Sequence, residues 1–222
     1  MSTLTFQIDK ERDIRNVWEL CNLESPFLEN EEKMQLNRVY KNWLGDRKFE
    51  GCKEEIKEYL NPLYSSGIIN IFTEGVEKAW ARINSEYFNR LEKLTQKPIC
   101  SKNFVVYTTS VGRCSYNPKE SSLMISLRRP LLQCLRTIGH ELIHLQFHNS
   151  YWVEIENQIG TERTSDLNES LTILLNTDFG DLWFVEDQGY DSHKELRKFI
   201  YNEWKKEKDF DVLMKKCVEY LK

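Results

Sequence analysis

Residues 103–127 restrict the fold more than any other part of the chain. Residues 103–109 and 123–127 are rich in β-branched, aromatic and aliphatic side chains, and turn-like residues lie between them at 111–113 and 115–118. These features are typical of two short β-strands. The chain on either side has apolar residues at helical spacing. The predicted architecture is therefore a small mixed sheet with helical segments before and after it, which belongs to the α+β class.

Helical patterns flank this predicted sheet. Apolar residues at helical spacing indicate a helix that stops at Pro62, a longer one over residues 73–96, and an amphipathic one over residues 131–148. A further helix is expected from near Thr164 or Ser165, which are good N-cap residues, and the charged and aromatic tail from about Ser192 is also expected to be helical.

The chain is predicted to form one compact unit of two parts. Residues 1–98 form a helical N-terminal part that packs on a core formed by residues 99–222, because no linker rich in Pro, Gly or Ser divides them. A chain of 222 residues with 40% hydrophobic residues is long enough to bury one sizeable core. Its net charge of −4 argues against a general affinity for nucleic acid, which needs a basic surface.

Neither a signal peptide nor a membrane span is predicted. Charged residues follow soon after Met1, and no apolar run approaches the length of a membrane helix. We therefore expect a cytoplasmic protein whose cysteines stay reduced. These are Cys21, Cys52, Cys100, Cys114, Cys134 and Cys217. A disulfide between Cys100 and Cys114, which flank a predicted strand, is the alternative.

His140, Glu141 and His144 form the sequence His-Glu-Leu-Ile-His on the predicted helix over residues 131–148. Histidines four residues apart project from one helix face, about 40° apart around the axis and about 6 Å along it. Two imidazoles so placed can bind one zinc ion, while Glu141, rotated by about 100°, lies near a water on the metal. Zinc lowers the pKa of that water, and Glu141 takes its proton as the water attacks a carbonyl. The alternative is three polar residues on a solvated helix face.

A strand at 123–127 followed by a helix with this motif resembles the zincin fold of metallopeptidases. The resemblance covers about residues 103–180. In zincins an edge strand pairs with an extended peptide and presents the peptide carbonyl to the metal. The resemblance implies a zinc-dependent metallopeptidase whose peptide or protein substrate lies along residues 123–127.

A catalytic zinc ion needs a third protein ligand and keeps a fourth position for water. The pair Asn168-Glu169, near the start of a predicted helix, resembles the second helix of gluzincins, the thermolysin-like branch of the zincins. In gluzincins the glutamate of such a pair is the third ligand. The resemblance implies that His140, His144 and Glu169 bind one zinc ion and that Glu141 is the general base.

Other residues are candidates around the metal. Thermolysin-like enzymes orient a ligand histidine with an aspartate four residues after the ligand glutamate, and this chain has Ile173 at that position. Asp166, one turn before the glutamate, is a candidate for that supporting role or for the ligand itself. His148 continues the four-residue spacing, but a continuous helix places it about 12 Å from the first motif histidine. A break in the helix would make Glu154 or Glu156 a candidate.

The negatively charged intermediate of peptide hydrolysis also needs a hydrogen-bond donor. In gluzincins this is usually a tyrosine or histidine beyond the third ligand, and Tyr190 and His193 lie at such positions. Arg113 and Tyr151 are further candidates. Residues 112–115 bear a faint likeness to SprT-like proteases, which bind zinc with three histidines and act near DNA. The acidic balance and the absence of a suitable later histidine argue against that likeness.

Two functions other than a peptidase are compatible with this motif. The first is a zinc-binding sensor or interaction module with a zincin fold and no activity. Glu141 argues against it, because a protein that only holds the metal has no chemical need for that carboxylate. The second is an all-helical partner-binding protein in which the motif is accidental.

Overall fold

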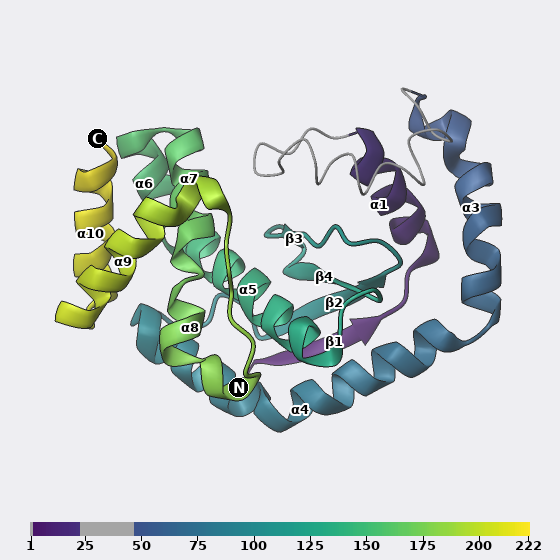
Figure 1. The fold of residues 1–222 in the computed structure, drawn as a ribbon, viewed down its shortest axis with the longest axis horizontal. Coiled ribbons are helices and arrows are strands. Elements are labelled where there is room, and N and C mark those ends of the chain that lie inside the picture. The colour runs from purple at the N-terminus through teal and green to yellow at the C-terminus, as the bar shows by residue number, and fades with distance from the viewer. Residues whose placement is uncertain (1, 23–46) are drawn as a thin grey trace.

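The computed structural model describes residues 2–22 and 47–222, and it has the predicted α+β fold. The described residues form a four-stranded sheet in the order β1-β2-β4-β3 (Figure 1). Its strands are β1 (Thr3–Gln7), β2 (Asn103–Thr109), β3 (Tyr116–Asn117) and β4 (Ser122–Ser126). β1, β2 and β4 are parallel, and β3 is antiparallel to β4. The strands predicted at 103–109 and 123–127 are therefore confirmed, the second with its bounds shifted by one residue.

The prediction that residues 1–98 are helical is wrong for β1. Thr3–Gln7 alternates polar and apolar residues, and the apolar ones, Leu4 and Phe6, pack against the main core. Phe6 lies opposite Val106 of β2, so the strand is fixed in register by a pairing far along the chain. A five-residue alternation is too short to predict a strand when a longer helical pattern follows it. Residues 23–46 of this predicted part lie outside the described residues.

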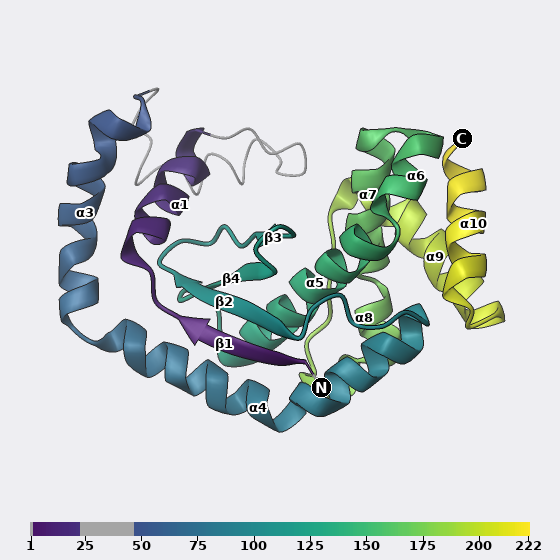
Figure 2. The same cartoon turned by 180° about the vertical axis from the view of Figure 1, so that it is seen from behind.

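Two long helices pack against the sheet. α4 (Ile68–Thr95) runs along it from the N-terminal helices at one end to the C-terminal helices at the other, as Figure 2 shows. α5 (Leu131–Ser150) packs against both β4 and α4. The two helices approach closely at Gly139, whose carbonyl oxygen accepts a hydrogen bond of 2.7 Å from the hydroxyl of Tyr87.

α1 (Lys10–Asn22) and α3 (Phe49–Ser65) form the N-terminal end of the molecule. They enclose a second, smaller hydrophobic cluster made of Ile14, Val17, Cys52, Ile56, Leu60 and Val111. The predicted stop at Pro62 is wrong, since α3 continues through it to Ser65. Pro62 is exposed, so water can bond the carbonyl that loses its helical partner.

A buried carboxylate joins this end to the sheet. Asp13 of α1 is 2% exposed and accepts hydrogen bonds from the hydroxyl of Thr109 at 2.6 Å and the backbone N–H of Ser110 at 2.9 Å. The hydroxyl of Tyr64 on α3 donates to its other oxygen at 2.9 Å. One side chain thus connects α1, α3 and the end of β2.

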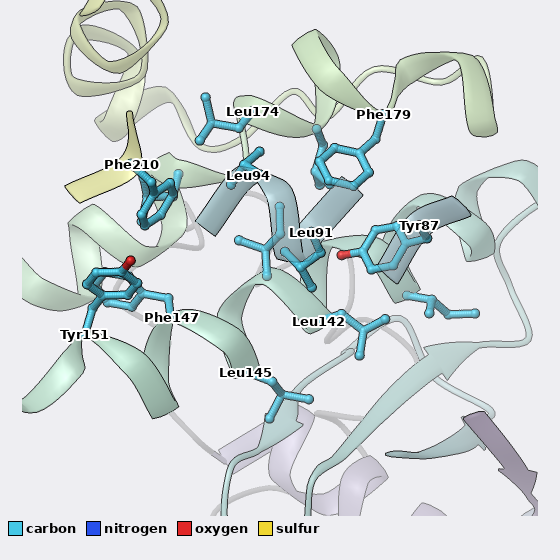
Figure 3. Packing of buried hydrophobic residues seen from close by; sticks show 14 of the residues in the cluster. Tyr87, Leu91, Leu94, Leu142, Leu145, Phe147, Tyr151, Leu174, Phe179 and Phe210 are labelled. Carbon is cyan, nitrogen blue, oxygen red and sulfur yellow. The ribbon is translucent and has the colours of Figure 1, made fainter. Parts of the chain in front are cut away.

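Five helices cover the other end. They are α6 (Trp152–Ile159), α7 (Thr161–Leu171), α8 (Leu174–Asp178), α9 (Lys194–Lys206) and α10 (Phe210–Leu221). Their apolar faces join α4 and α5 in the main core, where Leu91 of α4, Leu142 of α5 and Phe210 of α10 belong to one cluster (Figure 3). The helix predicted from Thr164 begins earlier, at Thr161.

The cysteines of the described residues are all free, so the alternative of a disulfide between Cys100 and Cys114 is wrong. Among the described helices, none combines the length and the apolar character that a membrane crossing requires.

Candidate metal centre

α5 places His140 and His144 on one face, as their spacing predicts. The His144 side chain is 1% exposed and that of His140 17%. Their Nε2 atoms face each other at 2.9 Å. Two ring nitrogens at this distance need a shared proton or a cation between them, because two lone pairs would repel.

α7 adds Glu169 to the pair. One carboxylate oxygen lies 3.4 Å from Nε2 of His144 and the other 3.7 Å from Nε2 of His140. One ligand atom from each of the three residues lies within 4.8 Å of the other two. Burial alone would raise the pKa of Glu169, but the two histidines outweigh it and hold this pKa well below its ordinary value. The three predicted ligands therefore form a cluster that could hold a metal ion.

The outer nitrogen of His144 is held by the residue before Glu169. Nδ1 of His144 lies 3.0 Å from Oδ1 of Asn168, and the amide nitrogen of Asn168 donates to the hydroxyl of Tyr116 at 3.0 Å. The Tyr116 ring packs against the imidazole at 5.2 Å between centroids. Because Asn168 offers an oxygen, the proton of His144 belongs on Nδ1, which leaves the Nε2 lone pair for a metal.

Asp187 holds the outer nitrogen of His140. Its Oδ2 lies 2.8 Å from Nδ1 of His140 and 2.5 Å from the guanidinium of Arg136, and Arg197 lies 3.2 Å from Oδ1. Thr172 donates to Oδ1 at 2.9 Å. Asp187 is 2% exposed, and burial alone would raise its pKa. His140 and the two arginines outweigh burial and keep the carboxyl ionised, with a pKa far below its ordinary value.

The same contact acts on His140. Burial lowers the pKa of an imidazole, but the charge of Asp187 and its hydrogen bond, with a smaller contribution from Glu169, raise the pKa of His140 to about 10. Asp187 thus orients the ring and makes it more basic.

Glu141 lies beside the cluster and outside it. Its side chain is buried, at 6% residue exposure, and burial raises the pKa of its carboxyl against the opposing charges of His140 and His144. A carboxylate with a raised pKa, next to a candidate metal and outside its ligands, has the properties of a proton acceptor.

The two predicted donors lie in neighbouring positions. Burial and then the charges of Glu169 and Glu141 raise the pKa of the Tyr190 phenol, so Tyr190 lies close to the cluster and stays protonated. His193 is 4% exposed, with Nε2 at 3.2 Å from Oδ1 of Asp166 and its ring 5.7 Å from that of Tyr190. The Tyr190 phenol is thus coupled electrostatically to Glu169 and Glu141, whereas Nε2 of His193 faces Asp166.

The alternative ligands lie elsewhere. Asp166 pairs with the imidazole of His193, and the His148 ring lies against that of Trp152, tilted by 34°, with 4.9 Å between centroids. The helix does break after α5 ends at Ser150. Beyond this break, the carboxylate of Glu156 accepts a hydrogen bond from the hydroxyl of Thr161.

Neither further donor candidate is at the cluster. Arg113 pairs with Glu19 at 2.9 Å, and the hydroxyl of Tyr151 donates to Asp211 at 2.9 Å.

The strand predicted to pair with a substrate is not an edge strand. β3 lies outside β4, with Tyr116 opposite Leu123, and the N–H of Met124 donates to the carbonyl of Ser115 at 2.9 Å. The prediction that an extended peptide pairs with residues 123–127 is therefore contradicted only at the start of β4, where β3 pairs with Ser122 and Leu123, and it stays a prediction for the residues that follow. The outer edge of the sheet at this end is the antiparallel segment 115–117.

Sequence reasoning missed the residues that hold the ligands. In the sequence, Asn168 stands out only as the neighbour of Glu169, and Asp187 does not stand out. Asp187 contacts His140 from a segment 47 residues further along the chain. No spacing links it to Arg136 or Arg197, so the sequence carries no signal for it.

Comparison of the chain with protein-family models, with curated proteins and with solved structures found no match.

Proposed function

We propose that this chain is a zinc-dependent metallopeptidase of the zincin type. The observation that carries the proposal is the convergence of His140, His144 and Glu169 beside a buried carboxylate, Glu141, that is not part of the cluster. A protein that only held a metal would need the first three residues and not the fourth.

The donor set fits zinc. Two imidazole nitrogens and one carboxylate are a common three-ligand set for catalytic zinc. The outer nitrogens of both histidines are already held by Asp187 and Asn168, as in sites that must keep ring orientation and tautomer fixed. When bound there, zinc supplies Lewis acidity to a water molecule and to a carbonyl oxygen.

The chain's own residues then have separate tasks. Glu141 accepts the proton of the attacking water and passes it to the leaving amine, a task suited to a buried carboxyl with a raised pKa. Tyr190 keeps its phenolic proton and donates a hydrogen bond to the oxygen that becomes negative. The remaining polar residues fix geometry, so that little reorganisation is needed during the reaction.

The substrate would lie along the outer edge of the sheet. Segment 115–117 is antiparallel to β4 and contains Tyr116, whose ring touches His144. An extended peptide can add to such an edge by main-chain hydrogen bonds, which accept many sequences.

The first experiment measures zinc content and peptide hydrolysis in two variants. Glu141→Gln should bind zinc like the wild type and lose at least about 100-fold in kcat, since it removes only the proton acceptor. Glu169→Gln should weaken zinc binding by more than the roughly 10- to 100-fold that loss of an outer partner costs. Elemental analysis and titration with a chelator give the zinc affinities.

Glu162→Gln is the matched control, because Glu162 is an exposed glutamate on the same helix as Glu169. It should change neither zinc affinity nor hydrolysis. Full activity in Glu141→Gln would refute the mechanism, and a protein that takes up iron in preference to zinc would refute the proposed metal.

An inactive zinc-binding module is the alternative of another class. It predicts bound zinc, no hydrolysis of any peptide by the wild type, and no effect of Glu141→Gln beyond stability.

A further inference from the structure

Several arginines surround the candidate metal centre, and one differs from the others. Arg136 and Arg197 are both committed to Asp187. Arg129, in the turn between β4 and α5, is partly exposed, and no carboxylate of the described part of the chain lies within ion-pair distance of it. Its side-chain hydrogen bond is a long one of 3.5 Å to the hydroxyl of Thr137.

This contact places the guanidinium next to the reacting groups. Thr137 is on α5, one turn before Glu141, so both side chains project from the same side of the helix. The charge of Arg129 also acts on the carboxyl of Glu141 and on the phenol of Tyr190. The cation therefore lies on the side of the cluster where the proposed proton acceptor and hydrogen-bond donor are.

A guanidinium in this position suits a carboxylate ligand. Its planar fork bonds both oxygens of a carboxylate, and such charge-assisted pairs are about twice as strong as neutral hydrogen bonds. Glu141 and Glu169 would repel an anionic substrate. A nearby cation without a carboxylate partner would offset this repulsion and allow such a substrate to bind.

We propose that Arg129 is a substrate-binding residue that receives a carboxylate lying close to the peptide bond that is cut. The inference rests on the proposed peptidase function and adds the substrate class to it. The carboxylate can belong to an acidic side chain or to the C-terminus of the peptide. Both sources present the same chemistry, and matched peptides separate them.

The experiment begins with the zinc-loaded wild type and a mixture of synthetic peptides, with the cut sites read by mass spectrometry. Peptides around the observed cut are then made in pairs, Glu against Gln beside the bond and free against amidated C-terminus. The wild type should cut the better carboxylate peptide with a kcat/KM roughly 10- to 100-fold above its uncharged match.

Variants assign that preference to Arg129. Arg129→Gln should abolish this preference, so that the charged peptide and its uncharged match are cut with equal kcat/KM, and Arg129→Lys should keep part of it. Arg82→Gln, the same change at an exposed position on α4, should behave as the wild type. Because the uncharged peptide is measured in each variant, a folding defect would be seen as a loss on both peptides.

The outcomes are distinct. Equal rates on charged and uncharged peptides in the wild type, or an unchanged preference in Arg129→Gln, would overturn the role of Arg129 and leave the peptidase proposal intact. If the zinc-loaded wild type cuts no peptide at all, the proposed function is wrong and the role of Arg129 is refuted with it.

Discussion

At the scale of single residues, the two facing Nε2 atoms determine how the centre responds to pH. His140 and His144 approach to 2.9 Å, a distance that a shared proton can bridge. With a pKa raised to about 10, His140 keeps its proton throughout the neutral range. A proton and a metal ion therefore compete for the same place.

Zinc affinity should consequently rise with pH. His140 is protonated below its raised pKa, so each zinc ion must displace about one proton, and the apparent association constant should increase about tenfold per pH unit between pH 6.5 and 8. Glu169 adds nothing to this slope, because its pKa lies well below the range. Calorimetry in buffers of different ionisation enthalpy measures the released proton directly.

Asp187→Asn tests the cause of that behaviour. Removing the charge that keeps the proton on His140 should reduce proton release at pH 7 and flatten the slope, while zinc affinity falls roughly 10- to 100-fold from loss of the outer partner. A flat dependence in the wild type would contradict the assigned basicity of His140.

The residues of the centre were predictable to different degrees. His140, Glu141 and His144 follow from helical periodicity, which is local. Glu169 needed a resemblance, because its place beside the histidines depends on the packing of α7 on α5. Asp187 could not be predicted, since its role depends on where a loop crosses that packed pair.

At the scale of elements, α5 depends on a glycine next to the first ligand. A Cβ added at Gly139 would lie 2.6 Å from the ring of Trp183 and 3.1 Å from that of Tyr87. Both rings are fully buried, so neither can move aside cheaply. The close approach of α4 and α5 thus sets the position of His140.

Gly139→Ala should therefore destabilise the protein by about 1 to 3 kcal/mol, despite the better helix propensity of alanine, and weaken zinc binding. Gly75→Ala on α4 is the matched control, because nothing lies within 4 Å of a Cβ there. It should gain about 0.5 to 1 kcal/mol. Equal free energies of unfolding for the two variants, measured in urea, would contradict this prediction, because they would mean that the Trp183 ring can move aside without destabilising the fold.

The sequence predicts whether a segment is a helix or a strand where its apolar pattern is long. The pattern over 73–96 found α4, and the pattern over 131–148 found α5. The outer strand β3 has two residues, which is too short for any periodicity. Because it pairs with β4, β4 is not the edge strand that the resemblance to zincins predicts. Sheet order is a tertiary property that strand composition does not encode.

At the scale of the whole molecule, a shared helix and a set of buried hydrogen bonds connect the two hydrophobic clusters. α4 runs from α3 at one end of the molecule to the C-terminal helices at the other (Figure 2). The hydrogen bonds of Asp13 hold α1 and α3 to the end of β2. We expect the N-terminal part and the core to unfold together, in agreement with one compact unit.

Asp13→Ala tests this connection. Loss of a buried carboxylate that accepts three hydrogen bonds should cost about 2 to 4 kcal/mol, and Tyr64→Phe, which removes one of them, about 1 kcal/mol. Circular dichroism and zinc release should report a single transition in both variants. Separate transitions, with zinc still bound after the first, would show that residues 2–22 and 47–65 fold independently.

The pairing of β1 with β2 also bears on how the chain folds. Thr3 lies opposite Asn103, so the first parallel pair in the sheet joins segments that α1, α3 and α4 separate in the sequence. During synthesis β1 must wait until β2 has left the ribosome, and closing so long a loop costs entropy before any contact repays it. The docking of β1 is therefore expected to follow the formation of α4, which lies between the two strands in the sequence and shortens the loop that must close.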